Sequence, residues 1–213
     1  MILFFGLILR IINLDRESIW LDEGISIKTA MLNAPDIIKY AAWKIIHPPF
    51  YSLVLHYWIV LFGNSEFYTR LLSVVLAFCA IFLIYRIGSL IFNDKVGLIS
   101  ALLLALSELH IRYSQEVRSY SLITFLSLLS IYFFIKLEKG SIKYSIGYVI
   151  SSTLLIYTHY YGLFIILAQN IYVFTKFLAP YDFLKINFKN WIKYQAILLV
   201  LFLPWISQQA LRS

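Results

Sequence analysis

Residues 69–92 read TRLLSVVLAFCAIFLIYRIGSLIF, and this stretch decides the class of fold. As a helix it is long enough to cross a hydrocarbon core of about 30 Å. Because similar runs recur along the whole chain, we expect an all-α polytopic membrane protein. The other apolar runs lie at about 1–14, 50–62, 96–110, 117–137, 144–159, 161–179 and 195–206.

The composition supports the same class. Hydrophobic residues make up 61% of the 213 residues, charged residues make up 14%, and the mean hydropathy is +0.80. A soluble domain is about half apolar and about a quarter charged, and a soluble core of this length could not bury so much apolar surface. The net charge of +7 does not indicate a nucleic-acid partner, because the basic residues form short clusters between apolar runs. A single cysteine, Cys79, supports neither a disulfide framework nor a thiolate metal site.

The topology depends on whether residues 50–62 cross the bilayer. Thirteen helical residues reach about 20 Å, so a re-entrant or interfacial helix is the better interpretation. Seven spans then result, with nine basic residues in the short connections on one side and three on the other. Basic residues favour the cytoplasmic side, which places the N-terminus inside and 13–66, 108–118 and the turn at 159 outside. The nine are Arg86, Lys95, Lys136, Lys139, Lys143, Lys176, Lys185, Lys189 and Lys193, and the three are Arg112, Arg118 and Arg212.

We expect one transmembrane domain over residues 1–213, in an integral, multi-pass protein of the plasma membrane. Its first outer loop, 13–66, should hold juxtamembrane helices, because apolar residues recur at helical spacing from Ile27 to Ile45. Asn33 has the place of a helix N-cap and divides this stretch into two short helices. They would either lie flat on the membrane or pack against the helix bundle.

Several polar residues in the outer segments could carry chemistry, and each has a structural alternative. Asp22 and Glu23 are adjacent carboxylates that suit a base or a metal ligand, whereas Asp22 could equally cap the following helix. His47 precedes two prolines that fix its direction, although a lone histidine is often structural. Arg70 either meets an anion at the outer face or forms an (i, i+4) ion pair with Glu66.

The second and third outer segments add four candidates. Glu116 and Arg118 lie in the loop YSQEVRSY, and charges near a bilayer cost about 2.5–3.5 kcal/mol each, so they usually pair or have a function. An aromatic belt would explain Tyr160 but not the neighbouring His159. The predicted topology brings these candidates to the same membrane face as the first loop. Carboxylates beside cations suit a reaction in which a base removes a proton while a phosphate departs.

The ordered segments LRIINL, WLDEG, HPPFYSLVLHYWIVLFG, EFYTRLLSVV, NDKVGLISALLLALS, YSQEVRSYSL and THYYG resemble the membrane portion of GT-C glycosyltransferases. They are most similar to glycosyltransferase family 39, the protein O-mannosyltransferase and aminoarabinose-transferase-like group, from about residue 9 to about residue 175. The resemblance implies many transmembrane helices and a sugar donor carried on a polyprenyl phosphate. Because family members usually continue with further spans, the chain is expected to lack C-terminal spans. The second loop lacks the DxD pattern of oligosaccharyltransferases, which argues against that branch.

The resemblance also implies roles for individual residues. Asp22 matches the base toward the acceptor hydroxyl, while Arg70, Arg118 and His47 would neutralise the departing lipid phosphate. Glu116 would orient Arg118 or the acceptor. The predicted catalytic residues are Asp22, Glu23 and Glu116, and the predicted substrate-binding residues are His47, Arg70, Arg118, His159 and Tyr160.

The expected activity is inverting transfer of a sugar from a polyprenyl-phosphate donor to a protein, lipid or glycan acceptor at the extracytoplasmic face. A divalent metal held by Glu23 with His47 or His159 would fit, although no spacing demands one. Two alternatives stay open. One is a non-catalytic transporter or binding protein for polyprenyl-linked sugars, although the sequence shows no paired halves of the kind that transporters often have. The other is an inactive fragment that acts as a scaffold.

Overall fold

The computed structural model describes residues 2–44, 47–178 and 187–210. Within these ranges the secondary structure is helical and contains no strand, which confirms the all-α prediction. A short 3-10 turn, Ile142–Tyr144, precedes α9. The helices are α1 (Ile2–Ile11), α2 (Leu21–Ala30), α3 (Ala34–Lys44), α4 (Phe50–Phe62), α5 (Glu66–Ile91), α6 (Asp94–Leu106), α7 (Glu108–Ser114), α8 (Tyr120–Glu138), α9 (Ser145–Thr158), α10 (Gly162–Leu178) and α11 (Phe188–Ala210).

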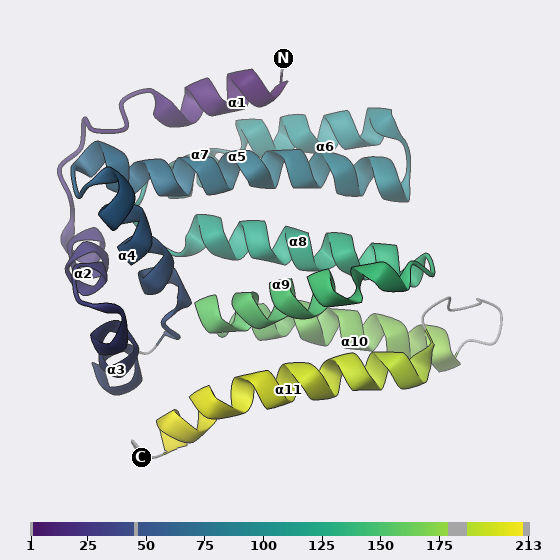
Figure 1. Cartoon of the computed structure of the whole chain (residues 1–213). Helices are drawn as coiled ribbons and strands as arrows, with labels where there is room; N and C mark the ends of the chain where they lie inside the picture. Colours follow the sequence, from purple (N-terminus) through teal and green to yellow (C-terminus); the bar gives the residue numbers. More distant parts are fainter. Residues whose placement is uncertain (1, 45–46, 179–186, 211–213) are drawn as a thin grey trace.

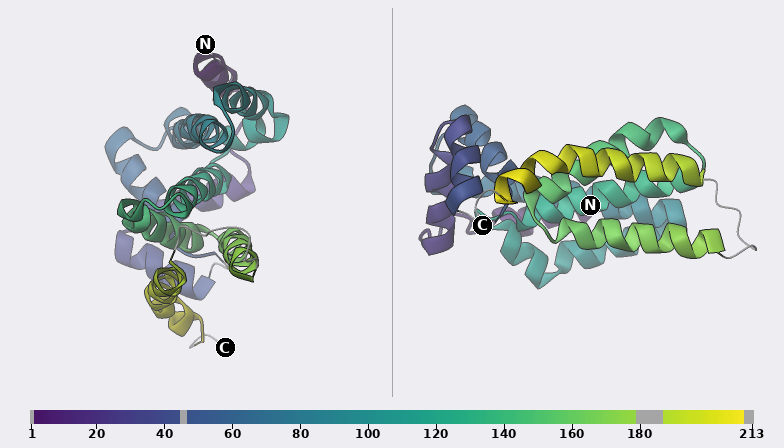
Figure 2. Two further views of the ribbon diagram at one scale, coloured as in Figure 1. Left: turned by 90° about the vertical axis from the view of Figure 1, so that its right-hand side faces the viewer. Right: turned by 90° about the horizontal axis from the view of Figure 1, so that it is seen from below.

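The helices form a bundle with a cap at one end (Figure 1). Helices α1, α5, α6, α8, α9, α10 and α11 run along one common direction, and α2, α3 and α4 cross that direction at the end where α5 begins. Seen end-on, the bundle is an elongated stack with α1 at one edge and α11 at the other (Figure 2). The predicted re-entrant or interfacial helix, α4, therefore belongs to the cap and not to the bundle.

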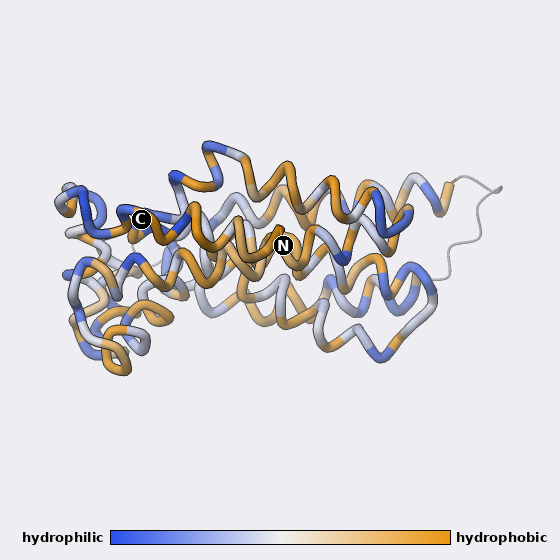
Figure 3. Tube along the Cα trace, turned by 90° about the horizontal axis from the view of Figure 1, so that it is seen from above, coloured by the Kyte–Doolittle hydropathy of each residue, from blue (hydrophilic) through white to orange (hydrophobic). Residues whose placement is uncertain are grey.

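The surface of the bundle suits lipid. Apolar residues occupy much of the length of the bundle, and hydrophilic residues gather toward its two ends (Figure 3). Large apolar side chains point outward, with Phe164 67% exposed, Leu103 66% and Ile146 70%. Exposed apolar area of this extent indicates a membrane or partner surface, and the apolar helices are those of an integral membrane protein.

The predicted count of seven spans is not confirmed. Within the described part of the chain, two helices are long and apolar enough to cross a membrane, α5 and α8, and a third span results if α6 and α7 form one broken span bent by 62°. Helices α1, α4 and α10 are apolar but shorter. The run at 144–159 lies in α9, which has only 14 residues, and the run at 195–206 lies in α11, where polar residues flank it on both sides.

The nine basic residues that were assigned to the cytoplasmic side lie toward the uncapped end wherever the structure describes them (Figure 1). Lys185 and Arg212 lie outside the described residues. Of the other eight of the nine, Lys136 and Lys176 lie in the last turns of α8 and α10, and Lys95 and Lys189 lie in the first turns of α6 and α11. Lys139 and Lys143 belong to the connection before α9, Arg86 lies in the second-last turn of α5, and Lys193 lies in the second turn of α11. Figure 1 shows these ends opposite the cap formed by α2–α4.

A buried polar network joins the C-terminal half of the bundle. Tyr148 on α9 donates its hydroxyl to Gln169 on α10 at 3.1 Å and accepts a hydrogen bond from Gln195 on α11 at 3.1 Å. Interhelical hydrogen bonds of this kind hold helices together in lipid, where apolar contact between helices is weakly favoured over contact with lipid. The network continues through Ser130, Ser152, Asn170 and Trp191.

Small residues allow close contact between α5 and α6. A Cβ added to Gly88 would lie 2.8 Å from the Cα of Gly97, and one added to Gly97 would lie 2.6 Å from the carbonyl oxygen of Tyr85. Glycines at these two positions therefore let the two backbones touch. In the cap, Asn33 Oδ1 accepts the N–H of Asp36 at 3.0 Å, so α3 begins with the predicted N-cap.

Candidate functional site

Segments that lie far apart in the sequence meet at the capped end of the bundle (Figure 1). They are the first turn of α2, the start of α5, the turn between α7 and α8, the turn between α9 and α10, and the residues before α4. The eight predicted site residues lie on these segments. Six of them form three pairs with different environments, and the side chains of the other two, Glu116 and Tyr160, bind residues outside the predicted set.

Glu23 and Arg70 form a buried, bidentate ion pair. Arg70 Nε lies 3.0 Å from Glu23 Oε1 and Arg70 Nη2 lies 2.8 Å from Glu23 Oε2. The two side chains are 1% and 4% exposed. Arg70 also donates to the backbone carbonyls of Leu14, Glu17 and Ser18 at 2.9, 2.7 and 3.5 Å. All five N–H groups of the guanidinium therefore have acceptors within the protein.

This geometry shows that the alternative pairing of Arg70 with Glu66 was wrong. The ion pairs between described residues include none between these two side chains. The guanidinium turns instead to Glu23, whose two oxygens match its planar fork. To bind a substrate anion, Arg70 would have to give up one of its present acceptors.

The carboxylate of Glu23 is equally occupied. The backbone N–H of Val117 donates to Oε1 at 2.9 Å, and the N–H of Trp20 donates to Oε2 at 3.4 Å. Burial alone would raise the pKa of Glu23, but the hydrogen bonds from Arg70 and Val117 outweigh it and hold the pKa below its ordinary value. A saturated, ionised carboxylate of this kind is poorly suited to accept a substrate proton or to bind a metal.

Asp22 has the opposite environment. Its side chain is 38% exposed, and Oδ2 lies 2.9 Å from Nη1 of Arg118, whose side chain is 24% exposed. The guanidinium of Arg118 also lies 5.9 Å from the ring centre of Trp20 and 5.7 Å from that of Tyr120, which are cation–π distances. The residue at the N-cap of α2 is Trp20, so the alternative that Asp22 merely caps this helix was wrong.

The buried contact between Glu23 and Val117 positions the exposed Asp22–Arg118 pair beside it. Glu23 accepts the backbone N–H of Val117, and the residues next to them in the sequence, Asp22 and Arg118, pair with each other. The buried contact fixes the distance between α2 and the turn before α8. The exposed pair is therefore held on a rigid support and remains accessible from outside.

The carboxylate of Glu116 pairs with Arg112, and the ion pairs between described residues include none between it and the guanidinium of Arg118; only the backbone carbonyl of Glu116 binds Arg118, accepting its backbone N–H at 2.9 Å. Glu116 Oε1 lies 3.5 Å from Arg112 Nε, and the same carbonyl accepts the hydroxyl of Ser73 at 2.7 Å. Burial raises the pKa of Glu116, although the charge of Arg112 opposes that shift. Glu116 thus belongs to the wall of a neighbouring cavity.

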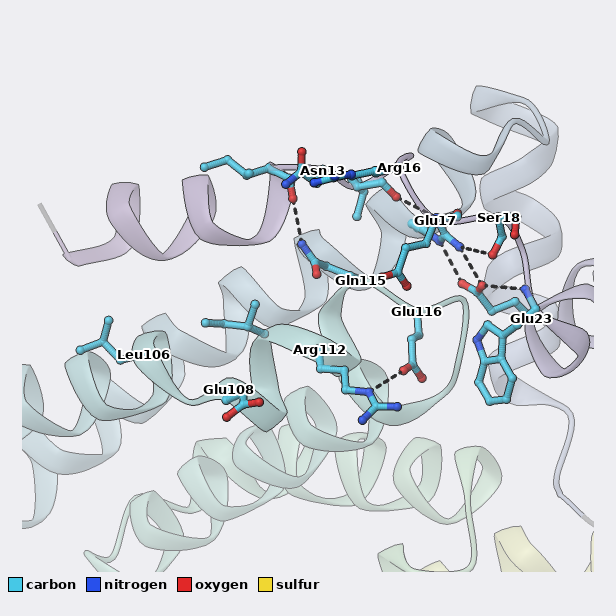
Figure 4. Close-up of a pocket in the computed structure, with 15 residues that line it drawn as sticks. Asn13, Arg16, Glu17, Ser18, Glu23, Leu106, Glu108, Arg112, Gln115 and Glu116 are labelled. Atoms are coloured by element: carbon cyan, nitrogen blue, oxygen red, sulfur yellow. Dashed lines mark hydrogen bonds and ion pairs between the residues drawn. The ribbon is translucent and has the colours of Figure 1, made fainter.

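A cavity of about 1000 Å³ opens beside the Glu23–Arg70 pair (Figure 4). Glu23, Arg70 and Glu116 line it, whereas the other five predicted residues are not among the described residues of its wall. In Figure 4, Arg112 points toward Glu116 on one side of the cavity, and the 13–18 loop forms the opposite side. The remaining lining residues are Ile12, Asn13, Leu14, Arg16, Glu17, Ser18, Trp20, Leu106, Glu108, Ile111, Arg112 and Gln115.

His47 and His159 come together from distant segments. Their rings stack with centres 4.3 Å apart and an angle of 30° between the planes. His159 Nδ1 accepts the N–H of Tyr161 at 3.0 Å, which assigns the proton of the neutral ring to Nε2. Burial and the charge of Arg118 lower the pKa of His47, and burial, His47 and Arg118 lower that of His159. Near pH 7 both rings are neutral, so they can offer hydrogen bonds but no positive charge.

Tyr160 serves as an anchor for its turn. Its hydroxyl accepts the indole N–H of Trp205 on α11 at 3.0 Å. For a divalent metal, the described residues offer no group of three or more His, Cys, Asp or Glu side chains.

Three buried polar residues near the site were not predicted from the sequence: Arg10, Tyr51 and His110. The hydroxyl of Tyr51 has no hydrogen-bond partner among the described residues, while His110 Nδ1 lies 2.6 Å from Arg10 Nη2. For Arg10 a signal was present in the sequence, because a charge inside an apolar run usually pairs or has a function.

Comparison with known sequences gives one family. Residues 46–207 match the family described as dolichyl-phosphate-mannose-protein mannosyltransferase. The match covers more than half of the chain and includes His47, Arg70 and Arg118, but it begins after Asp22 and Glu23. A search of curated proteins found no match.

Proposed function

The chain belongs to the dolichyl-phosphate-mannose-protein mannosyltransferase family, and from this premise we propose that it transfers a sugar from a polyprenyl-phosphate donor to an acceptor hydroxyl at the extracytoplasmic face. The family is one of GT-C membrane glycosyltransferases, and it implies a protein acceptor in general. The observation that carries the proposal is the exposed Asp22–Arg118 pair held beside the buried Glu23–Arg70 pair.

In the proposed reaction, the carboxylate of Asp22 takes the proton of the acceptor hydroxyl. The hydroxyl oxygen forms a bond to the anomeric carbon of the sugar as the bond from that carbon to the phosphate oxygen breaks. The electron pair leaves with the polyprenyl phosphate, and the configuration at the anomeric carbon inverts. A base and a charge-stabilising cation are the two groups that this step requires.

Arg118 supplies the cation in this proposal. In the structure it hydrogen-bonds to Asp22 and so competes with the acceptor for that carboxylate. A donor phosphate that binds Arg118 would weaken this contact and free Asp22 to act as a base. His47 and His159 would add hydrogen bonds to the phosphate instead of positive charge, because both rings are neutral near pH 7.

Glu23 and Arg70 have a positioning role in the proposal. The sequence suggested a reacting acid and a phosphate ligand, but both side chains are saturated by contacts within the protein. The pair holds α2 against α5, and through Val117 it holds the turn that carries Arg118. Tyr160 ties the third outer turn to α11 in the same manner.

The test is transfer of labelled sugar from a polyprenyl-phosphate donor in membranes that contain the wild type, Asp22→Asn or Asp36→Asn. Asp36 is the matched control, because its carboxylate is on the same loop, contacts Asn33, and forms none of the ion pairs found between described residues. We expect the wild type and Asp36→Asn to transfer sugar and Asp22→Asn to lose transfer while still binding donor. Full activity of Asp22→Asn would show that Asp22 is not the base. Donor binding without transfer in the wild type would instead favour a binding or transport protein.

A further inference from the structure

Arg10 is fully buried in the apolar helix α1 and makes contacts to a different part of the bundle. Its exposed fraction is 0%. Nη1 donates to the carbonyl of Gly6 at 2.8 Å and to that of Ala105 at 3.1 Å, and Nη2 donates to that of Leu104 at 3.1 Å. Nη2 also lies 2.6 Å from Nδ1 of His110. One guanidinium thus joins α1 to the end of α6 and to α7.

The carbonyls of Leu104 and Ala105 that Arg10 binds belong to the last turn of α6, and that of Leu104 also accepts the N–H of Ser107 at 3.4 Å. Helix α6 ends at Leu106, and the chain bends by 62° before α7 continues. The last carbonyls of a helix have no partner within it, and in apolar surroundings such groups must be satisfied by other parts of the protein. Arg10 therefore caps the broken end of α6 and makes this bend stable.

A second contact runs in the opposite direction. Gln115, at the end of α7, donates through Nε2 to the carbonyl of Arg10 at 3.3 Å and to that of Ile12 at 3.1 Å. These are carbonyls at the end of α1. Each helix end thus receives hydrogen bonds from a side chain of the other, and we call Arg10 and Gln115 together the helix-break clamp.

The clamp ends one residue before the turn that forms the transfer site. Residues 116–118 follow Gln115 directly, and within them Val117 donates to Glu23 and Arg118 pairs with Asp22. The direction of α7 decides where this turn lies, and the clamp fixes that direction. We propose that the helix-break clamp positions the 116–118 turn against α2, and that Arg10 is a positioning residue for the proposed transfer. The reaction part of this inference rests on the proposed function.

The first test measures the position of the turn without any reaction. Hydrogen–deuterium exchange of peptides covering 113–120 is compared in the wild type, Arg10→Lys, Gln115→Leu and Gln169→Leu. Gln169 is the matched control, because it is also a glutamine whose side chain makes two hydrogen bonds to other helices, to Ser130 and Tyr148. We expect exchange in 113–120 to rise about tenfold in the two clamp variants and to stay unchanged in the control, because only the clamp variants loosen this segment.

The second test measures donor-to-acceptor transfer with the same variants. We expect kcat to fall about tenfold to a hundredfold in Arg10→Lys and Gln115→Leu, because small displacements of positioned groups slow a reaction strongly. The two changes together should lower kcat by less than the product of their separate effects, since both act on one segment. Gln169→Leu should retain the wild-type kcat.

Unchanged exchange of 113–120 in both clamp variants would overturn the inference, and so would raised exchange with unchanged kcat. An equal rise in the Gln169→Leu control would do the same, because it would indicate general loosening of the bundle. If wild-type membranes show no transfer, the proposed function is wrong, and the exchange experiment alone decides whether the clamp holds the turn.

Discussion

Replacing Glu23 by glutamine tests the buried ion pair on which the capped end of the bundle depends. Glutamine has nearly the same shape and can still accept the N–H of Val117. It cannot balance the charge of Arg70, which is 4% exposed and 2.8 Å away. The substitution therefore leaves a buried guanidinium without a counter-charge, while the cavity and the fold around it keep their shape.

The expected cost follows from that burial. Removing one partner of a buried ion pair typically costs about 3–5 kcal/mol, because the remaining charge is uncompensated. In a protein of this size, such a loss lowers the melting temperature by about 6–20 °C. The matching substitution Arg70→Met should cost a similar amount. The double variant should cost less than the sum by roughly 2–3 kcal/mol, because the second change removes the charge that the first one stranded.

Thermal unfolding in detergent, followed by intrinsic tryptophan fluorescence, measures these differences. Glu66→Gln is the matched control, since Glu66 lies one helical turn from Arg70 and makes no ion pair with it among the described residues. A control that is destabilised as strongly as Glu23→Gln would refute the assignment of the pair. If the losses in unfolding free energy of the two single substitutions simply add in the double variant, a direct interaction between Glu23 and Arg70 is refuted.

Three further predictions concern stability. The folded-state pKa of Glu23 lies below its ordinary value of 4.5. The stability that the ionised carboxylate gives the fold is therefore complete above pH 4.5 and is lost as the pH falls through the depressed pKa. Acid titration should destabilise the wild type more than Glu23→Gln. Gly97→Ala should destabilise the α5–α6 contact by about 1–3 kcal/mol, whereas Gly24→Ala, whose added Cβ would meet its nearest atom at 3.9 Å, should be nearly neutral in the same unfolding assay. Tyr148→Phe should cost about 1–3 kcal/mol, because the buried Oε1 of Gln169 and the partly buried Nε2 of Gln195 both lose the hydroxyl that they bind. A melting temperature equal to that of the wild type would contradict a continuous network.

Much of the position of the site could be predicted, because it depends on the order in which apolar runs and polar turns alternate along the chain. Apolar runs separated by polar turns imply alternating helices, and alternation brings 13–66, the turn before α8 and the turn after α9 to one end (Figure 1). The sequence also indicated Asp22, Glu23, Arg70 and Arg118 as residues near one another. The count of spans was less predictable, because hydropathy does not show where a run such as 96–110 bends.

The partners of these residues were decided by tertiary structure. Asp22 and Glu23 are adjacent, and neighbouring residues on a helix point about 100° apart. Only the docking of α2 determines that Glu23 is buried against Arg70 while Asp22 is exposed beside Arg118. A local rule favoured Glu66 as the partner of Arg70, but a buried carboxylate 47 residues away fits its donors better.

The sequence alone determined that this protein is helical, apolar enough for a membrane and polar at a few defined turns, because composition and hydrophobic spacing are local properties. The tertiary structure decided which charge is buried and which is exposed. It also decided that Arg10, inside the first apolar run, binds the carbonyls of a helix break about 95 residues away. Hydrogen-bond partners at such separations depend on how the helices pack, and no local pattern in the chain encodes that packing.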